Sequence, residues 1–181
     1  MWVKILIYDV ISMPFQTVAL KTVEYLAVPS VVGHEQHFMR YLKNDFEKLG
    51  LSVTQHKGIL EISGNAPRSA IISAHIDRHG LISIGKGQYA YAAQYVREQK
   101  YGEENNPSKK TLEAISGRFE GEIVYAYDPN TGDHLGEGTI ESCETSIENG
   151  DSIFYIHGMK EMPKNTPVGY ARQARDDGKS L

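Results

Sequence analysis

An apolar run that ends in a histidine and an aspartate constrains the fold of this chain more than any other feature. Residues 70–74 form a run typical of a buried strand, and His75, Asp77 and Gly80 follow it. Because alternate side chains of an extended chain point the same way, we expect His75 and Asp77 on one side and Ile76 on the other. Open α/β sheets place their sites at the carboxyl ends of strands, so the pattern predicts a functional site here.

Length and charge limit the class of protein. With 181 residues, of which 40% are hydrophobic, the chain is expected to form one large domain or two small ones. The formal net charge is -4 and no basic block is present, which argues against nucleic-acid and membrane-surface partners. The single Cys143 excludes an internal disulfide framework. Because Asp9 interrupts the apolar opening early, we expect neither a membrane span nor a signal peptide, and a cytoplasmic protein.

The segments before the apolar run predict helices and strands of an α/β domain. A first helix is expected from the N-cap Thr17 to about Leu26, and a second, amphipathic helix is expected to end at Gly50. Strands are expected over residues 51–55 and 59–62, with a turn between them. With the run itself, these elements predict the first half of an α/β sheet.

The second half of the chain predicts a small barrel or sandwich. Segments 118–127 and 134–141 flank a turn rich in Pro, Asn and Gly, and they predict a β-hairpin. Further strands are expected over 81–84 and 151–156, and one helix over 89–100. Several short strands joined by tight turns are typical of a small barrel.

The chemistry of His75 and Asp77 has two interpretations. The first is a strand-end histidine paired with a carboxylate for structural reasons, because His-x-Asp is short and arises often by chance. The second is a metal ligand, His75, with Asp77 holding its ring, because a ligating imidazole normally has its other ring nitrogen bound to an acceptor. The residue types alone leave both open.

Three groups of residues carry a resemblance to a known family. They are the loop Pro29-Ser-Val-Val-Gly33-His-Glu35 ahead of an amphipathic helix, the Lys57-Gly58 turn, and Ser73-Ala-His75-Ile-Asp77-Arg-His-Gly80. This arrangement resembles the start of the two-metal aminopeptidases, closest to the glutamyl aminopeptidase or tetrahedral aminopeptidase family. In that family a Pro-x-x-Ser-Gly-x-Glu loop precedes the helix, and a small β-barrel interrupts the peptidase domain.

The resemblance implies a fold and a function. The fold is α/β: part of a zinc-exopeptidase sheet domain over residues 1–82, an inserted β-barrel over 83–170, and a return segment over 171–181. The activity is hydrolysis of N-terminal peptide bonds, in which a water activated by two zinc or cobalt ions attacks the carbonyl and a Glu takes its proton. His75 would bind one metal ion and Asp77 would act beside it in the catalytic site. Peptides would be the substrates, and the family's barrel implies a homo-oligomer.

The sequence departs from the family pattern in ways that affect the metal site. Arg78 follows Asp77, where the family usually has a Glu. The family's other ligands, among them a bridging Asp, follow the barrel. Asp176 and Asp177 are candidates for the bridging residue, and the alternative is an Asp just beyond Leu181. We therefore expect a chain that lacks part of the ligand set, either a portion of a longer peptidase or a degenerate copy.

Two alternative functions stay open. One is a related metallo-carboxypeptidase or deacylase, although that group usually places its inserted domain after more of the metal ligands. The other is a binding or assembly module in which the barrel is the functional part and the site is vestigial.

Other polar residues are expected to have structural roles. His79 is adjacent to the pair and is assigned a supporting role rather than ligation. His34 and His37 are expected on a solvated helix face, because no third ligand is near them in the sequence. Glu35 corresponds to the family's loop Glu, and Cys143 is expected to be a small buried side chain.

Overall fold

The chain forms a mixed α/β structure of two compact units. The computed structural model describes residues 2–5, 15–64, 71–101, 114, 119–146 and 151–170. Unit 1 contains Met1–Ser30 and Glu35–Asp77, and unit 2 contains Val31–His34 and Arg78–Ala171. The chain passes from unit 1 to unit 2 between Asp77 and Arg78. In the described part of the chain, no helix is long and apolar enough to cross a membrane.

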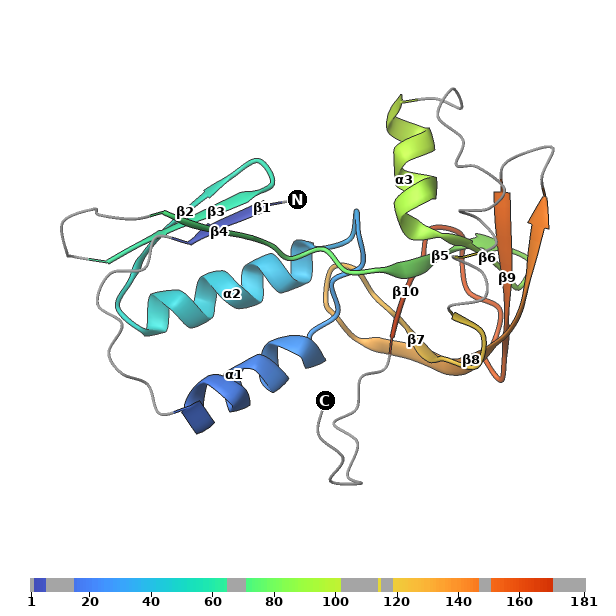
Figure 1. Cartoon of the computed structure of the whole chain (residues 1–181), viewed down its shortest axis with the longest axis horizontal. Coiled ribbons are helices and arrows are strands. Elements are labelled where there is room, and N and C mark those ends of the chain that lie inside the picture. Colours follow the sequence, from blue (N-terminus) through green and yellow to red (C-terminus); the bar gives the residue numbers. More distant parts are fainter. Residues whose placement is uncertain are drawn as a thin grey trace. The chain divides into compact units, whose positions relative to one another are not determined.

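Unit 1 is a four-stranded sheet with two helices on one side (Figure 1). Its strands are β1 (Trp2–Ile5), β2 (Ser52–His56), β3 (Ile59–Ser63) and β4 (Ile72–His75), and its helices are α1 (Phe15–Ala27) and α2 (Gln36–Lys48). The strand order is β2-β3-β1-β4, with β1 parallel to β3 and antiparallel to β4. The expected helices and strands are present, but α1 begins at Phe15, so Thr17 lies inside the helix and does not cap it.

The core of unit 1 lies between α2 and the sheet. It consists of Phe38, Met39 and Leu42 from the helix, and Leu60, Ile62 and Ile76 from the sheet and the residue after β4. Helix α2 ends at Lys48, with Leu49 as its C-cap, and the expected helix-ending residue Gly50 follows; Gly50 adopts φ +78° and donates its N–H to the Glu47 carbonyl at 3.0 Å. A residue with this left-handed conformation is normally glycine, because other side chains are strained there.

The expectation that residues 70–74 form a buried strand is wrong for the part of that run that the structure describes. Every residue of β4 is exposed, and Ile71 and Ile72 are 63% and 48% exposed. The reason is the position of β4 in the sheet: it lies at the edge, and among the described strands it pairs only with β1. Strand order depends on residues far apart in the sequence, so an apolar run alone does not determine burial.

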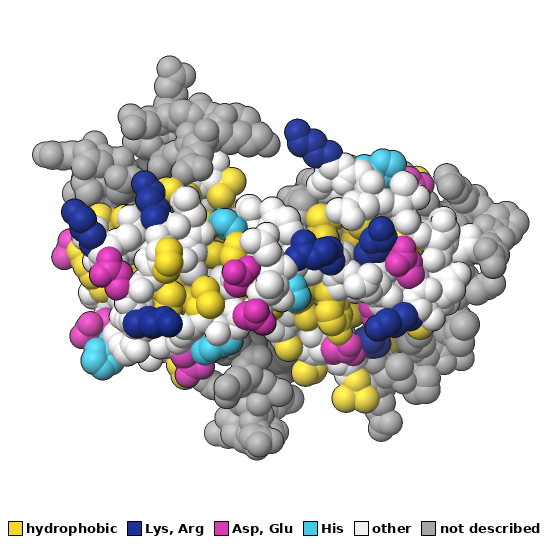
Figure 2. All heavy atoms as spheres, turned by 180° about the vertical axis from the view of Figure 1, so that it is seen from behind, with side chains coloured by type: hydrophobic (Ala, Val, Ile, Leu, Met, Phe, Trp, Pro, Cys, Tyr) yellow, Lys and Arg dark blue, Asp and Glu magenta, His cyan; other side chains and the backbone are white. Residues whose placement is uncertain are grey.

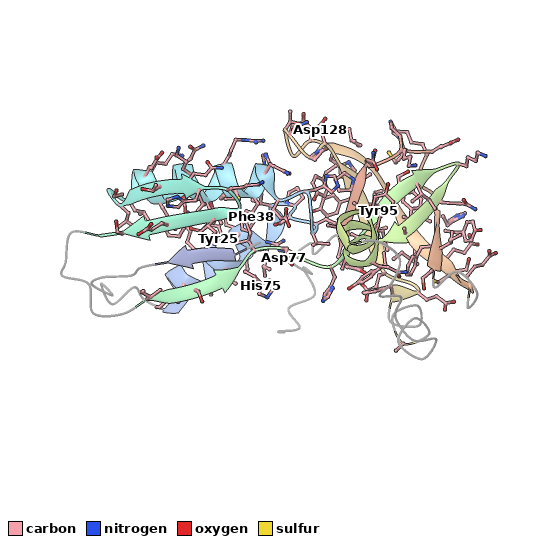
Figure 3. The ribbon with its side chains drawn as sticks, turned by 90° about the horizontal axis from the view of Figure 1, so that it is seen from above. Tyr25, Phe38, His75, Asp77, Tyr95 and Asp128 are labelled. Atoms are coloured by element: carbon pink, nitrogen blue, oxygen red, sulfur yellow. The ribbon has the colours of Figure 1, made fainter. Side chains whose placement is uncertain are left out.

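Polar side chains join α1 to α2. Lys21 Nζ lies 3.1 Å from Asp45 Oδ1, and the Tyr25 hydroxyl donates to Asp45 Oδ2 at 2.6 Å. The Tyr25 ring also packs edge-to-face on Phe38, with centroids 6.2 Å apart (Figure 3). Burial alone raises the pKa of the Asp45 carboxyl, but the hydrogen bonds from Tyr25 and Lys21 outweigh it, and the pKa lies below its ordinary value. The charged carboxylate therefore stabilises the packing of the two helices.

This network predicts an acid-dependent contribution to stability. Asp45→Asn should lower the free energy of unfolding by about 1 kcal/mol near neutral pH, because a charged hydrogen-bond acceptor is lost. A carboxyl whose pKa is depressed by folding stabilises above its unfolded pKa, so the difference between Asp45→Asn and the parent should shrink below about pH 4. The free energy of unfolding is measured by urea unfolding. The fluorescence of the single tryptophan, Trp2, which belongs to unit 1, follows the transition.

The matched control for Asp45→Asn is Glu47→Gln. Glu47 is an exposed carboxylate on the same helix, 4.0 Å from Lys43, and exposed ion pairs contribute little to stability. If Asp45→Asn and Glu47→Gln had the same effect at every pH, the stabilising role of the network would be wrong.

Unit 2 is a closed six-stranded antiparallel barrel. Its strands follow the order β10-β5-β6-β9-β8-β7. They are β5 (Gly80–Gly85), β6 (Gln88–Tyr91), β7 (Ile123–Tyr127), β8 (His134–Ser146), β9 (Asp151–His157) and β10 (Pro167–Tyr170). The main buried cluster includes Leu81, Tyr89, Val124, Ile140, Phe154 and Val168. The expected hairpin is confirmed as β7 and β8, and closure removes the open edges that a small sheet would expose.

Two parts of the barrel differ from the sequence-based expectation. The helix expected over 89–100 is α3 (Ala92–Tyr101), and the residues before Ala92 belong to strand β6. Tyr89 and Tyr91 alternate into the barrel core, and pairing of β6 with β5 and β9 outweighs the helical pattern. Strand β10 is not among the expected strands; its first residue is Pro167, and proline is tolerated at the first residue of a strand.

A short segment from the N-terminal half of the chain completes unit 2. Val31 is buried in a cluster with Ile82, Ala92 and Tyr127. Its backbone N–H donates to the Tyr127 hydroxyl at 2.8 Å, and the next N–H, of Val32, donates to the Arg78 carbonyl at 3.1 Å. Buried backbone groups need such partners, so Tyr127 fixes this segment in the unit.

We expect Tyr127→Phe to destabilise unit 2 by about 1–3 kcal/mol, because it leaves the buried N–H of Val31 without its acceptor. Amide hydrogen exchange, followed by NMR, measures the local destabilisation: the backbone N–H of Val31 should exchange faster in Tyr127→Phe than in the parent protein. Tyr125→Phe is the control on the same strand, since the described residues supply no hydrogen bond to the Tyr125 hydroxyl. Equal exchange in both variants would contradict the role of Tyr127.

Candidate metal-ligand site

His75 and Asp77 lie side by side where β4 ends (Figure 3). His75 Nδ1 is 3.4 Å from Asp77 Oδ1 and 3.2 Å from the Asp77 backbone oxygen. The His75 side chain is 63% exposed and that of Asp77 is 29% exposed. The expectation that these two side chains share one side of the chain is confirmed.

The residue between them points the other way and is buried. Ile76 belongs to the core cluster of unit 1 with Leu60 and Ile62. Its carbonyl, which follows the last residue of β4, accepts a 2.6 Å hydrogen bond from the hydroxyl of Ser30, which is 2% exposed. Both the side chain and the backbone of Ile76 are therefore held in place.

The geometry assigns different roles to the two ring nitrogens of His75. Two oxygens of Asp77, Oδ1 and the backbone oxygen, lie near Nδ1. If Nδ1 carries the proton, Nε2 carries the lone pair, and a lone pair on imidazole nitrogen is what a metal ion binds. The same arrangement, a carboxylate or carbonyl behind a ligating imidazole, orients metal ligands in proteins. The residues fit one ligand position together with its orienting acceptor.

The described residues do not supply a complete metal site. Within the ranges that the structure describes, no three His, Cys, Asp or Glu side chains form a group that could hold a metal ion. Asp176 and Asp177, the candidates for a bridging ligand, lie outside those ranges. Within the described part of the chain, His75 and Asp77 therefore have no third side chain with which they could form a metal site.

The other candidate residues have structural surroundings. His79 belongs to unit 2, where its Nδ1 lies 2.6 Å from the Tyr91 hydroxyl and its ring stacks on that tyrosine. His34 precedes α2, so its expected place on the helix is wrong, and burial lowers its pKa. Glu35 is buried, and Cys143 is partly buried against the barrel core.

Surface charge gives no sign of a polyanion site on the face drawn in Figure 2. Acidic and basic side chains are mixed over that face, consistent with the small formal net charge of -4. A phosphate backbone is normally bound by clustered Lys and Arg side chains.

No family model matches the chain, and comparison with the curated proteins and with the solved structures gives no significant match.

A metal titration tests the ligand count. Because a zinc site normally needs three protein ligands and the described residues supply one imidazole with one carboxylate behind it, calorimetric titration of the 181-residue chain with Zn²⁺ or Co²⁺ should give no nanomolar binding. Nanomolar, stoichiometric binding would contradict this expectation. If that binding were lost in Asp176→Asn or Asp177→Asn, the substituted aspartate would be assigned as a missing ligand.

Proposed function

We propose that His75 is one ligand of a metal centre in a metal-dependent aminopeptidase and that Asp77 orients its ring. The observation that carries the proposal is the placement of the Asp77 carboxylate and carbonyl at His75 Nδ1, with the ring exposed at a strand end. The exposed pair itself contributes little to stability, so it is better explained by ligand orientation than by folding.

The proposed site requires further side chains beyond the described residues. The family resembled places its remaining ligands after the barrel. Strand β4, which carries His75 at its end, is exposed and lies at the end of the strand order. A zinc or cobalt pair, when bound, would supply an activated water and stabilise negative charge on the substrate carbonyl. The part of this chain is to present the Nε2 atom of His75 in a fixed direction.

A second function is favoured by a specific observation. The barrel is closed and has its own core, whereas the described residues form no complete metal group. A binding or assembly module with a vestigial site would have these two properties. The experiment that tests the peptidase proposal also separates it from this alternative.

The test uses the protein isolated at its native length from its source. Release of p-nitroaniline from aminoacyl p-nitroanilides should be abolished by chelation and restored by Co²⁺ or Zn²⁺. His75→Ala should lower the activity by more than about 100-fold, and Asp77→Asn by about 10- to 100-fold, as expected for a ligand and the group that orients it. No cleavage by the metal-loaded protein would overturn the peptidase proposal and favour the binding module.

His56→Ala is the matched control for a histidine of the same unit. His56 lies on β2, is exposed, and has its Nε2 3.3 Å from Glu61 Oε2, so it resembles His75 in environment but not in proposed role. Activity that falls equally in His56→Ala and His75→Ala would contradict the assignment of His75.

A further inference from the structure

Ser30 lies next to the candidate site although it is far from it in the sequence. Its hydroxyl donates to the Ile76 carbonyl at 2.6 Å across a separation of 46 residues. Ser30 is 2% exposed, and it follows Pro29 in the loop after α1. Because a proline fixes its own φ, the backbone that leads into Ser30 has little freedom.

The Ile76 carbonyl needs this hydrogen bond. It belongs to the first residue after β4, whose ladder ends at His75. A buried carbonyl without a hydrogen-bond partner lowers the stability of the fold. The hydroxyl of Ser30 supplies the hydrogen bond that the strand ladder does not provide at this residue. The bond fixes the orientation of the peptide plane between Ile76 and Asp77.

That peptide plane determines where Asp77 lies. The carbonyl of Ile76 and the N–H of Asp77 belong to one rigid unit, so a rotation that frees the carbonyl also moves Asp77. Asp77 Oδ1 and the Asp77 backbone oxygen lie 3.4 Å and 3.2 Å from His75 Nδ1. The Ile76 side chain is anchored in the core, which leaves rotation of this plane as the motion that Ser30 prevents.

From these contacts we infer that Ser30 is a positioning residue for the His75–Asp77 pair: its hydroxyl locks the Ile76–Asp77 peptide and thereby holds the acceptors of Asp77 against His75 Nδ1. The inference rests on the proposed function for its catalytic consequence. Its structural content, that Ser30 controls the environment of the His75 ring, is independent of activity. Ser30 touches neither the proposed metal nor the substrate, and it acts through the backbone of Ile76.

NMR of the full chain tests the structural content. In Ser30→Ala, the ring ¹⁵N signals of His75 should shift toward a lower population of the tautomer protonated at Nδ1, while those of His56, on another strand of the same unit, should stay in place. Ser30→Thr keeps the hydroxyl and should restore the parent signals. Unchanged His75 signals in a folded Ser30→Ala protein would overturn the inference, and so would a failure of folded Ser30→Thr to restore them.

Ser152→Ala is the control for loss of a buried serine hydroxyl. Ser152 is buried in unit 2, and among the described residues its hydroxyl has no hydrogen-bond partner. The Ser152→Ala protein should keep the parent signals of His75. If the signals of His75 shift as much in Ser152→Ala as in Ser30→Ala, loss of any buried serine hydroxyl is sufficient to move the ring. The hydrogen bond to Ile76 would then have no specific role, and the inference would be overturned.

Kinetics of the native-length protein test the catalytic consequence. Ser30→Ala should lower kcat for aminoacyl p-nitroanilides by about 10-fold with little change in KM, and Ser30→Thr should recover it. A kcat in Ser30→Ala equal to that of the parent would overturn the catalytic part. If the parent protein shows no metal-dependent cleavage, the proposed function fails, whereas the NMR comparison still decides whether Ser30 positions the pair.

Discussion

The structure depends on how the chain is held where it leaves the sheet and enters the barrel. Residues 76–79 lie between β4 and β5, so their backbone groups rely on partners outside the ladders. In unit 1 the partner is the hydroxyl of Ser30, which binds the Ile76 carbonyl; in unit 2 it is the N–H of Val32, which binds the Arg78 carbonyl. One loop, placed early in the sequence, thus supplies hydrogen bonds to both units.

The same loop contributes a side chain to the core of the barrel unit. Val31 is 1% exposed and packs with Ile82 and Tyr127 in a core that residues 83–170 alone would leave incomplete. Gly80 accommodates this packing, because a Cβ there would lie 2.6 Å from both Val31 Cγ2 and the Val168 backbone oxygen. Glycine at the end of the His-x-Asp segment therefore allows two chain segments to approach each other closely.

Local patterns predicted the parts of the fold that local interactions determine. The stripe of α2, the glycine that ends it and the hairpin of β7 and β8 all follow from short-range periodicity and turn chemistry. The exposure of β4 and the assignment of Tyr89 to a strand depend on which strands become neighbours, and no short window contains that information. At the site, alternation was sufficient to place His75 beside Asp77, but nothing in the sequence around Ser30 indicates which carbonyl it binds.

The side chain of His75 is exposed and that of Asp77 is partly exposed, whereas the residue between them is held by both its side chain and its backbone. An exposed histidine and carboxylate 3.4 Å apart attract each other weakly in water, and by themselves would sample many arrangements. Here the order comes from the residue between them, whose side chain is in the core and whose carbonyl is bound by a buried hydroxyl. A ligand site needs this combination, an accessible donor atom held in a fixed direction by buried neighbours, because a flexible donor loses entropy on binding. The proposed ligand role of His75 accounts for an exposed imidazole beside a residue, Ile76, that is buried and hydrogen-bonded.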